Sequence, residues 1–192
     1  TTIVIPARPG AGGSRFPFSD VGRNDDCYDA VKYLYENEIM NGTSDTLFSP
    51  NAELTRGMVV TILYRMEGEP FTLGSKSFSD VKAGRYYSEA VEWAAENGVV
   101  NGFTDGTFKP DQAVTREQLA SILRRYASFS GIATYDAELP ANASVSNWAK
   151  KDVAWAYAEG ILTSAQMVAA AKNANRAEVA MAIYAYLTGT AR

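Results

Sequence analysis

Hydrophobic residues recur at helical spacing in six stretches of the chain, arranged as three pairs. In the first stretch Ala30, Val31 and Leu34 fall on one face, which predicts a helix over about residues 27–38. Similar patterns predict helices over residues 86–97 and 148–159. The second member of each pair carries a longer apolar stripe: Val59-Ile62-Leu63-Met66, Leu119-Ile122-Leu123-Tyr126 and Val179-Ile183-Tyr186-Leu187. The pattern therefore predicts an all-α fold built from helix–loop–helix units.

The second helix of each pair begins at a residue that favours helix starts. Thr55, Thr115 and Asn175 precede the apolar stripes, and all three are of types that cap helix N-termini. Thr115 with Gln118 and Asn175 with Glu178 have the spacing of a capping box, whereas the residue three positions after Thr55 is a methionine. We therefore expect helices to begin at residues 56, 116 and 176, each with an arginine in its first turn.

The pairs are copies of one another. The segment Phe18-Ser19-Asp20-Val21 recurs 60 residues later, and 18 of the 48 positions from residue 18 to residue 65 are identical at that offset. A weaker third copy resembles the second around residues 153–160, with a loop two residues shorter. We expect repeats at residues 18–66, 78–127 and 140–188, and a linker from a preceding domain at residues 1–17. Because one helix pair cannot enclose a core, the three repeats should form one folded unit.

Composition narrows the chemistry that such a unit can support. The 192 residues carry a net charge of −4, with no histidine and a single cysteine, Cys27. The acidic balance argues against nucleic acid as a partner, and the missing histidine excludes Ser–His and Cys–His nucleophile pairs. No apolar run reaches the roughly 20 residues of a membrane span. The loop at Asp105 lacks the ligand spacing of an EF-hand, so we expect no metal site and no cofactor, and Cys27 should fill the core.

The order of short motifs in the second copy resembles that of the S-layer homology (SLH) family. Phe-Ser-Asp-Val at residues 78–81 is followed by Asn-Gly at 101–102, Asp-Gly-Thr-Phe-Lys-Pro at 105–110 and Thr-Arg-Glu-Gln at 115–118. The resemblance implies three repeats packed around a pseudo-threefold axis, and an extracellular location in the cell wall or S-layer. It also implies non-covalent anchoring of an exported bacterial protein to a secondary cell-wall polysaccharide, an anionic polymer that is often pyruvylated. We expect this fragment to be monomeric.

In that family the arginine of the Thr-Arg-Ala-Glu motif lies in the grooves between repeats and contacts the ligand, which points here to Arg56, Arg116 and Arg176. A guanidinium at a helix N-terminus combines a two-pronged donor for carboxylates with the partial positive charge of the helix end. The residue chemistry alone also allows each arginine to pair with a carboxylate across a repeat interface. Copy two retains most of the motif, whereas copy three lacks the Asp-Gly-x-Phe-x-Pro loop. We therefore expect Arg116→Ala to weaken wall binding more than Arg176→Ala.

Further candidate ligand-binding residues surround these arginines. They are the capping residues Thr55, Thr115 and Asn175, the turn residues Asp20 and Asp80, the loop glycines Gly42 and Gly102, and the surface aromatic Trp148. The aspartates and glycines also have a structural interpretation, since aspartate accepts backbone hydrogen bonds in turns and glycine adopts positive φ. Trp93 and Trp155 lie on predicted helix faces, so we expect both in the core.

Two other classes of function remain open. A glycan-acting enzyme of the cell wall would use paired carboxylates, and Glu117 and Glu178 lie near the arginines in sequence. No carboxylate pair recurs at equivalent positions of the copies, however, so we expect no catalytic residues. Helical repeat arrays also serve as protein–protein interaction modules. The recurring Arg, Gly and Pro residues suit binding and folding better than proton transfer.

Overall fold

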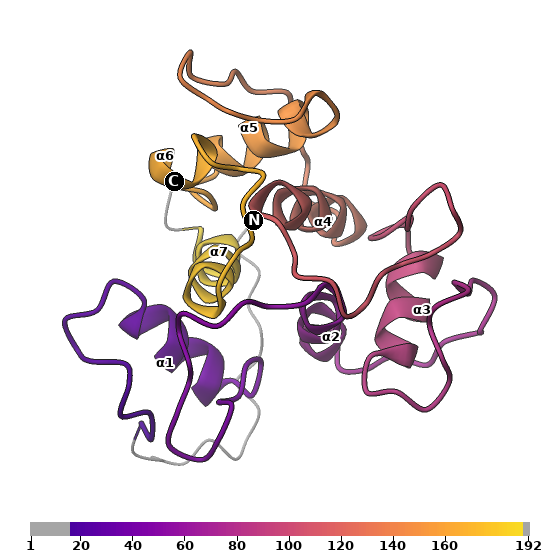
Figure 1. The fold of residues 1–192 in the computed structure, drawn as a ribbon, viewed down its shortest axis with the longest axis horizontal. Coiled ribbons are helices and arrows are strands. Elements are labelled where there is room, and N and C mark those ends of the chain that lie inside the picture. Colours follow the sequence, from indigo (N-terminus) through magenta and orange to yellow (C-terminus); the bar gives the residue numbers. More distant parts are fainter. Residues whose placement is uncertain (1–15, 190–192) are drawn as a thin grey trace.

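A computed structural model describes residues 16–189, so most of the expected linker at residues 1–17 lies outside the described residues. Residues 16–189 form seven α-helices and one short 3-10 helix and contain no strand, which agrees with the all-α prediction (Figure 1). The pairs are α1 (Tyr28–Glu36) with α2 (Arg56–Met66), α3 (Ser88–Glu96) with α4 (Arg116–Phe129), and α5 (Lys150–Ala158) with α7 (Arg176–Thr188). The 3-10 helix η1 (Asn147–Ala149) precedes α5, and the short α6 (Ser164–Met167) lies in the loop before α7.

The second helix of each pair begins where the capping residues predict. The side chain of Thr55 accepts a hydrogen bond from the backbone N–H of Met58. Thr115 forms a reciprocal capping box with Gln118, and Asn175 forms one with Glu178. Each cap satisfies an N–H group that has no partner within its own helix, which stabilises such a helix start by about 1 kcal/mol.

The first helices are shorter than predicted at both ends. They begin at residues 28, 88 and 150 instead of 27, 86 and 148, and they end at residues 36, 96 and 158. The early ends have a local cause, because the chain turns to positive φ at Glu38, Gly98 and Gly160, two residues beyond each helix. A left-handed residue at this point closes a helix C-terminus.

Each first helix packs against the second helix of a different pair. Helix α3 packs against α2, α5 against α4, and α1 against α7, which joins the two ends of the chain. In Figure 1, α2, α4 and α7 lie toward the centre, and α1, α3 and α5 lie outside them. The apolar core includes fully buried Phe48 and Phe108 from the loops, and Cys27, Trp93 and Trp155 are buried as the sequence predicts.

The loops that lead into α2, α4 and α7 hydrogen-bond to one another in a closed ring. The N–H of Leu54 donates to the carbonyl of Ala174 (3.3 Å), Ala174 donates to Val114 (2.8 Å), and Val114 donates to Leu54 (2.9 Å). Isolated antiparallel bridges flank these bonds, at positions that differ by 60 residues from one loop to the next. The three helix pairs are therefore joined by backbone contacts at the point where each second helix begins.

Within residues 16–189, every helix is too short or too polar to cross a membrane.

Candidate functional site

Two of the three predicted arginines reach from the start of one helix into the loop of another copy. Arg56 on α2 donates from Nε to the carbonyl of Phe108 at 2.8 Å, and Arg176 on α7 donates from Nε to the carbonyl of Phe48 at 2.7 Å. Each guanidinium also lies over the ring of the same phenylalanine, 4.6 Å away for Arg56 and 4.5 Å away for Arg176. A carbonyl and an aromatic face thus hold each cation in one orientation.

Asp20 and Asp80 position the loops that receive these arginines. The carboxylate of Asp20 accepts hydrogen bonds from the backbone N–H groups of Phe48 and Ser49, at 2.8 and 2.7 Å. Asp80 binds the N–H groups of Phe108 and Lys109 at the same two distances. Both carboxylates are therefore engaged by backbone donors. They position the loops that receive the arginines, and their negative charge also favours the charged form of Arg56 and Arg176.

Arg56 opens onto a cleft of about 620 Å³, which we call the Arg56 cleft. Its walls are the loop at residues 100–104, one face of α4 and Trp148 of η1. Gly102 and Thr115 also line it, so four of the predicted ligand-binding residues meet here. Arg56 itself is 6% exposed, and burial lowers the pKa of its guanidinium to about 10. Trp148 is 57% exposed and presents a free aromatic surface at the rim.

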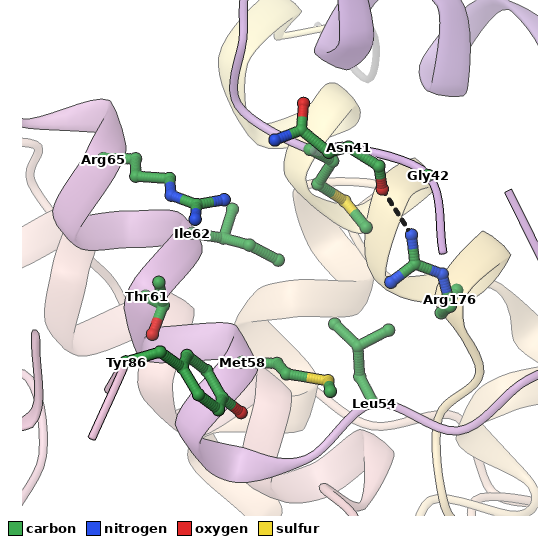
Figure 2. Close-up of a pocket in the computed structure, with 10 residues that line it drawn as sticks. Asn41, Gly42, Leu54, Met58, Thr61, Ile62, Arg65, Tyr86 and Arg176 are labelled. Atoms are coloured by element: carbon green, nitrogen blue, oxygen red, sulfur yellow. Dashed lines mark hydrogen bonds between the residues drawn. The ribbon is translucent and has the colours of Figure 1, made fainter. Parts of the chain in front are cut away.

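Arg176 opens onto a smaller cleft of about 240 Å³, the Arg176 cleft, shown in Figure 2. Its Nη2 donates to the carbonyl of Asn41 at 2.6 Å, and Gly42 follows in the same wall. The opposite wall is the face of α2 that carries Met58 and Arg65, and Tyr86 lies at the side. Burial lowers the pKa of Arg176 as well.

Arg116 is engaged differently. Its Nη2 and Nε donate to the two carboxylate oxygens of Glu178, at 2.6 and 3.1 Å, and its Nη1 donates to the carbonyl of Ala169 at 3.1 Å. The two side chains are 16% and 14% exposed. This is the carboxylate pairing across a repeat interface that the residue chemistry allowed. It gives no support to the expectation that Arg116 contributes more to wall binding than Arg176.

The helix N-termini themselves have few free donors. The N–H groups of Arg56, Arg116 and Arg176 donate to carbonyls of neighbouring loops, at 2.8 to 3.0 Å. The capping oxygens of Thr55, Thr115 and Asn175 accept from the third residue of each helix. An anion at these helix ends would therefore be held by guanidinium groups, and the caps serve mainly to fix the helix starts.

Gly42 and Gly102 are required by the backbone. A Cβ atom at Gly42 would lie 2.4 Å from a ring carbon of Phe18, and one at Gly102 would lie 2.3 Å from the equivalent carbon of Phe78. Gly102 also has φ of +69°. Both glycines line clefts while allowing a phenylalanine to pack beneath the loop.

The cleft residues that were not predicted from the sequence include two arginines and a tyrosine. Arg125 lines the Arg56 cleft, and Arg65 and Tyr86 line the Arg176 cleft. The arginines carry a signal, because Arg65 and Arg125 are an identical pair at the repeat offset of 60 residues. Tyr86 precedes α3 by two residues, as Trp148 precedes α5, so it occupies the same place in its copy.

Comparison with known proteins identifies two segments of the chain. Residues 17–57 and 77–120 match the family model of the S-layer homology domain. Both segments include a loop that lines a cleft and the arginine that starts the next helix. The matched segments do not include residues 140–188, where the sequence suggests a third and divergent copy.

Relatives of the chain include surface and anchoring proteins. An amylopullulanase from Thermoanaerobacterium thermosulfurigenes is 32% identical over 168 residues, which is 83% of this chain and 9% of that protein. A surface-layer 125 kDa protein from Lysinibacillus sphaericus is 28% identical over 72% of this chain and 12% of its own length. A cellulosome-anchoring protein from Acetivibrio thermocellus is 25% identical over 69% of this chain and 30% of its own length. The chain thus spans between 9% and 30% of these relatives, and it matches only a small part of the one named as an enzyme.

The matched segments and the surface-layer and anchoring relatives agree with the motif order in the sequence. Residues 17–57 and 77–120 are S-layer homology segments of a cell-surface anchoring module, located outside the cell in the cell wall or S-layer.

Proposed function

We propose that the three copies form one pseudo-threefold unit that binds an anionic secondary cell-wall polysaccharide in the Arg56 and Arg176 clefts, and so anchors an exported bacterial protein to the wall. The closed ring of backbone hydrogen bonds supports the packing. The observation that carries the binding proposal is a guanidinium in each cleft to which no carboxylate of residues 16–189 is hydrogen-bonded, so Asp80 and Asp20 attract these cations only from a distance.

The fixed orientation of Arg56 suits a carboxylate ligand. Its Nε is bound to the carbonyl of Phe108, and among the described residues its two terminal nitrogens have no hydrogen-bond acceptor. These nitrogens can donate to a carboxylate in a bidentate arrangement. A pyruvate ketal on a sugar supplies such a carboxylate next to a pyranose ring. The low exposure of Arg56 strengthens this attraction, because solvent screens it less than it would screen a surface pair.

An aromatic residue at the rim of each cleft fits the sugar part of the ligand. Trp148 and Tyr86 are each 57% exposed, and each lines a cleft with an arginine to which no carboxylate of the described residues is hydrogen-bonded. Such side chains present an apolar face to the C–H groups of a sugar ring and keep a polar tip in water. The combination of guanidinium and aromatic platform favours a carboxylated glycan over a simple inorganic anion.

The carboxylates near the arginines support binding over catalysis. Glu117 accepts hydrogen bonds from the N–H and hydroxyl of Ser146, at 3.1 and 2.9 Å. Ser146 lies two residues before Trp148, so Glu117 fixes the approach to η1. Glu178 is bound to Arg116 and to the N–H of Asn175. Both side chains thus have partners that explain their positions without a role in proton transfer.

A sedimentation assay tests the proposal. The chain is mixed with purified walls, with walls from which the secondary polysaccharide has been removed, and with soluble polysaccharide as competitor. We expect it to sediment with intact walls only and to be released by the competitor. Binding to stripped walls at the same level would refute polysaccharide recognition, and release of reducing ends would favour the enzyme alternative. Arg23 is an exposed arginine outside both clefts. A matched comparison of Arg56→Ala with Arg23→Ala therefore distinguishes the loss of a cleft contact from the effect of the change in net charge on binding.

A further inference from the structure

We propose that Arg125 and Arg65 are ligand-binding residues, so that each cleft holds the carboxylate of the glycan between two guanidinium groups from different helices. This inference rests on the proposed function and specifies how the same clefts recognise their ligand. Arg125 on α4 shares the Arg56 cleft with Arg56 of α2, and Arg65 on α2 shares the Arg176 cleft with Arg176 of α7.

Helix geometry explains why one helix serves two clefts. Arg65 follows Arg56 by nine residues, as Arg125 follows Arg116. Nine residues turn an α-helix by about two and a half turns, so the two side chains leave opposite faces. Helix α2 therefore sends its first arginine into one cleft and its second into the next. The nine-residue spacing is thus the spacing expected of a shared wall between neighbouring binding sites.

The second arginines lack strong partners within the protein. Among the residues that the structure describes, no hydrogen bond or ion pair involves the guanidinium of Arg125. The contact of Arg65 is a long one, 3.9 Å to Glu69, whose side chain is 61% exposed. Figure 2 shows Arg65 and Arg176 extending from opposite walls toward the same space. Two cations that face one cavity repel each other unless an anion lies between them.

The third arginine, Arg116, lies at a junction between α4 and α7 that lacks, at the equivalent positions, both a second arginine and an exposed aromatic residue. Nine residues after Arg176, α7 carries Ala185 where α2 and α4 carry the second arginines. Its third residue is Glu178, which neutralises Arg116, where α4 has Gln118 and α2 has a methionine. Two residues before α1 the chain has Asp26, whereas the two clefts have an exposed aromatic there. The second arginine therefore accompanies a first arginine that has no hydrogen-bonded carboxylate among the described residues, and it is missing where the first arginine is bound to Glu178.

Titration of the whole chain with small glycosides tests the assignment. The probes are a methyl hexoside that carries a pyruvate ketal and the same hexoside without the ketal. We expect Arg125→Ala and Arg65→Ala each to weaken ketal binding at one cleft by about 10- to 100-fold, the range for loss of hydrogen bonds between charged groups. Arg125→Gln, which keeps the length of the side chain, should show the same loss. Arg23→Ala, which makes the same change in net charge outside the clefts, should leave the affinity within about twofold.

The possible outcomes distinguish this inference from the proposed function. If the unaltered chain binds the ketal hexoside but Arg125→Ala and Arg65→Ala bind it as Arg23→Ala does, the second arginines have no role in recognition and the polysaccharide proposal stands. If the unaltered chain binds neither the hexoside nor the polysaccharide, the proposed function fails and the inference fails with it. Equal binding of both hexosides would also overturn the inference, because the arginines would then not be reading the carboxylate. Circular dichroism of each variant confirms that the helices are retained.

Discussion

The ion pair between Arg116 and Glu178 should contribute more to stability than to ligand binding. Replacement of Arg116 by methionine removes two hydrogen bonds to the carboxylate and one to the carbonyl of Ala169. Methionine keeps most of the apolar stem in place. The Glu178 carboxylate, 14% exposed, then retains only its 3.3 Å capping bond to the N–H of Asn175. Removal of one partner from a well-buried pair costs about 3–5 kcal/mol, and residual exposure places this case at the lower end, about 3 kcal/mol.

Urea or thermal unfolding followed by circular dichroism measures this loss. For a chain of this size, about 3 kcal/mol corresponds to a decrease in Tm of about 6–12 °C. The double variant Arg116→Met/Glu178→Gln should recover part of the loss, because glutamine can keep the capping box, as Gln118 does in α4, without a buried charge. In the wall assay we expect Arg176→Ala to weaken binding more than Arg116→Met. A loss of stability below about 0.5 kcal/mol combined with the largest loss of wall binding would refute this assignment.

Three further predictions concern single positions. Ser121→Ala should leave stability unchanged or raise it slightly, because the buried Ser121 hydroxyl has no partner among the described residues. Thr61→Val should cost about 1 kcal/mol, because the Thr61 hydroxyl donates to the backbone carbonyl of Gly57 at 2.8 Å. Urea unfolding of both variants compares the two effects directly. Gly102→Ala should lower stability by about 2–5 kcal/mol, combining the cost of a left-handed alanine with that of a methyl group pressed against a phenylalanine ring, and Gly131→Ala, where φ is +75° but the space is open, should show only the first part. Burial raises the pKa of Tyr186 to about 12 from its ordinary value of 10.0, so the stabilisation that it provides is complete below pH 10 and is lost as the pH rises toward 12. Tyr186→Phe should therefore unfold less steeply with pH over that interval, and parallel curves for the two proteins would contradict the assignment.

Features encoded by neighbouring residues were predicted well from the sequence. The starts of α2, α4 and α7 follow from capping side chains that act within four residues, and the structure contains the predicted caps. The buried stripes follow from helical periodicity, which also placed Trp93 and Trp155 in the core. The predicted positions of the C-terminal ends of the first helices were less accurate. They depend on where the chain turns to positive φ, and a glutamate such as Glu38 does not indicate that conformation from its residue type.

Contacts between copies were not predictable in the same way. The sequence placed three arginines at equivalent positions, yet Arg116 alone meets a carboxylate, because only α7 has a glutamate three residues after its cap. The spacing of Glu178 from Asn175 predicts a capping box, and no neighbouring residue in the sequence indicates that Glu178 also binds Arg116. The second wall of each cleft comes from a different helix, so Arg65 and Tyr86 are recognised as cleft residues only when the packing is known.

The closed ring formed by Leu54, Val114 and Ala174 bears on how the proposed binding to the wall could be strengthened. A linear repeat array has free ends, and it gains binding surface whenever another unit is added. Here each unit already has two neighbours, and α1 occupies the face of α7 on which a fourth unit would stack. Duplication within the chain therefore cannot add a cleft. If the proposed function holds, a tighter attachment to a long polymer would come from several chains that bind it side by side.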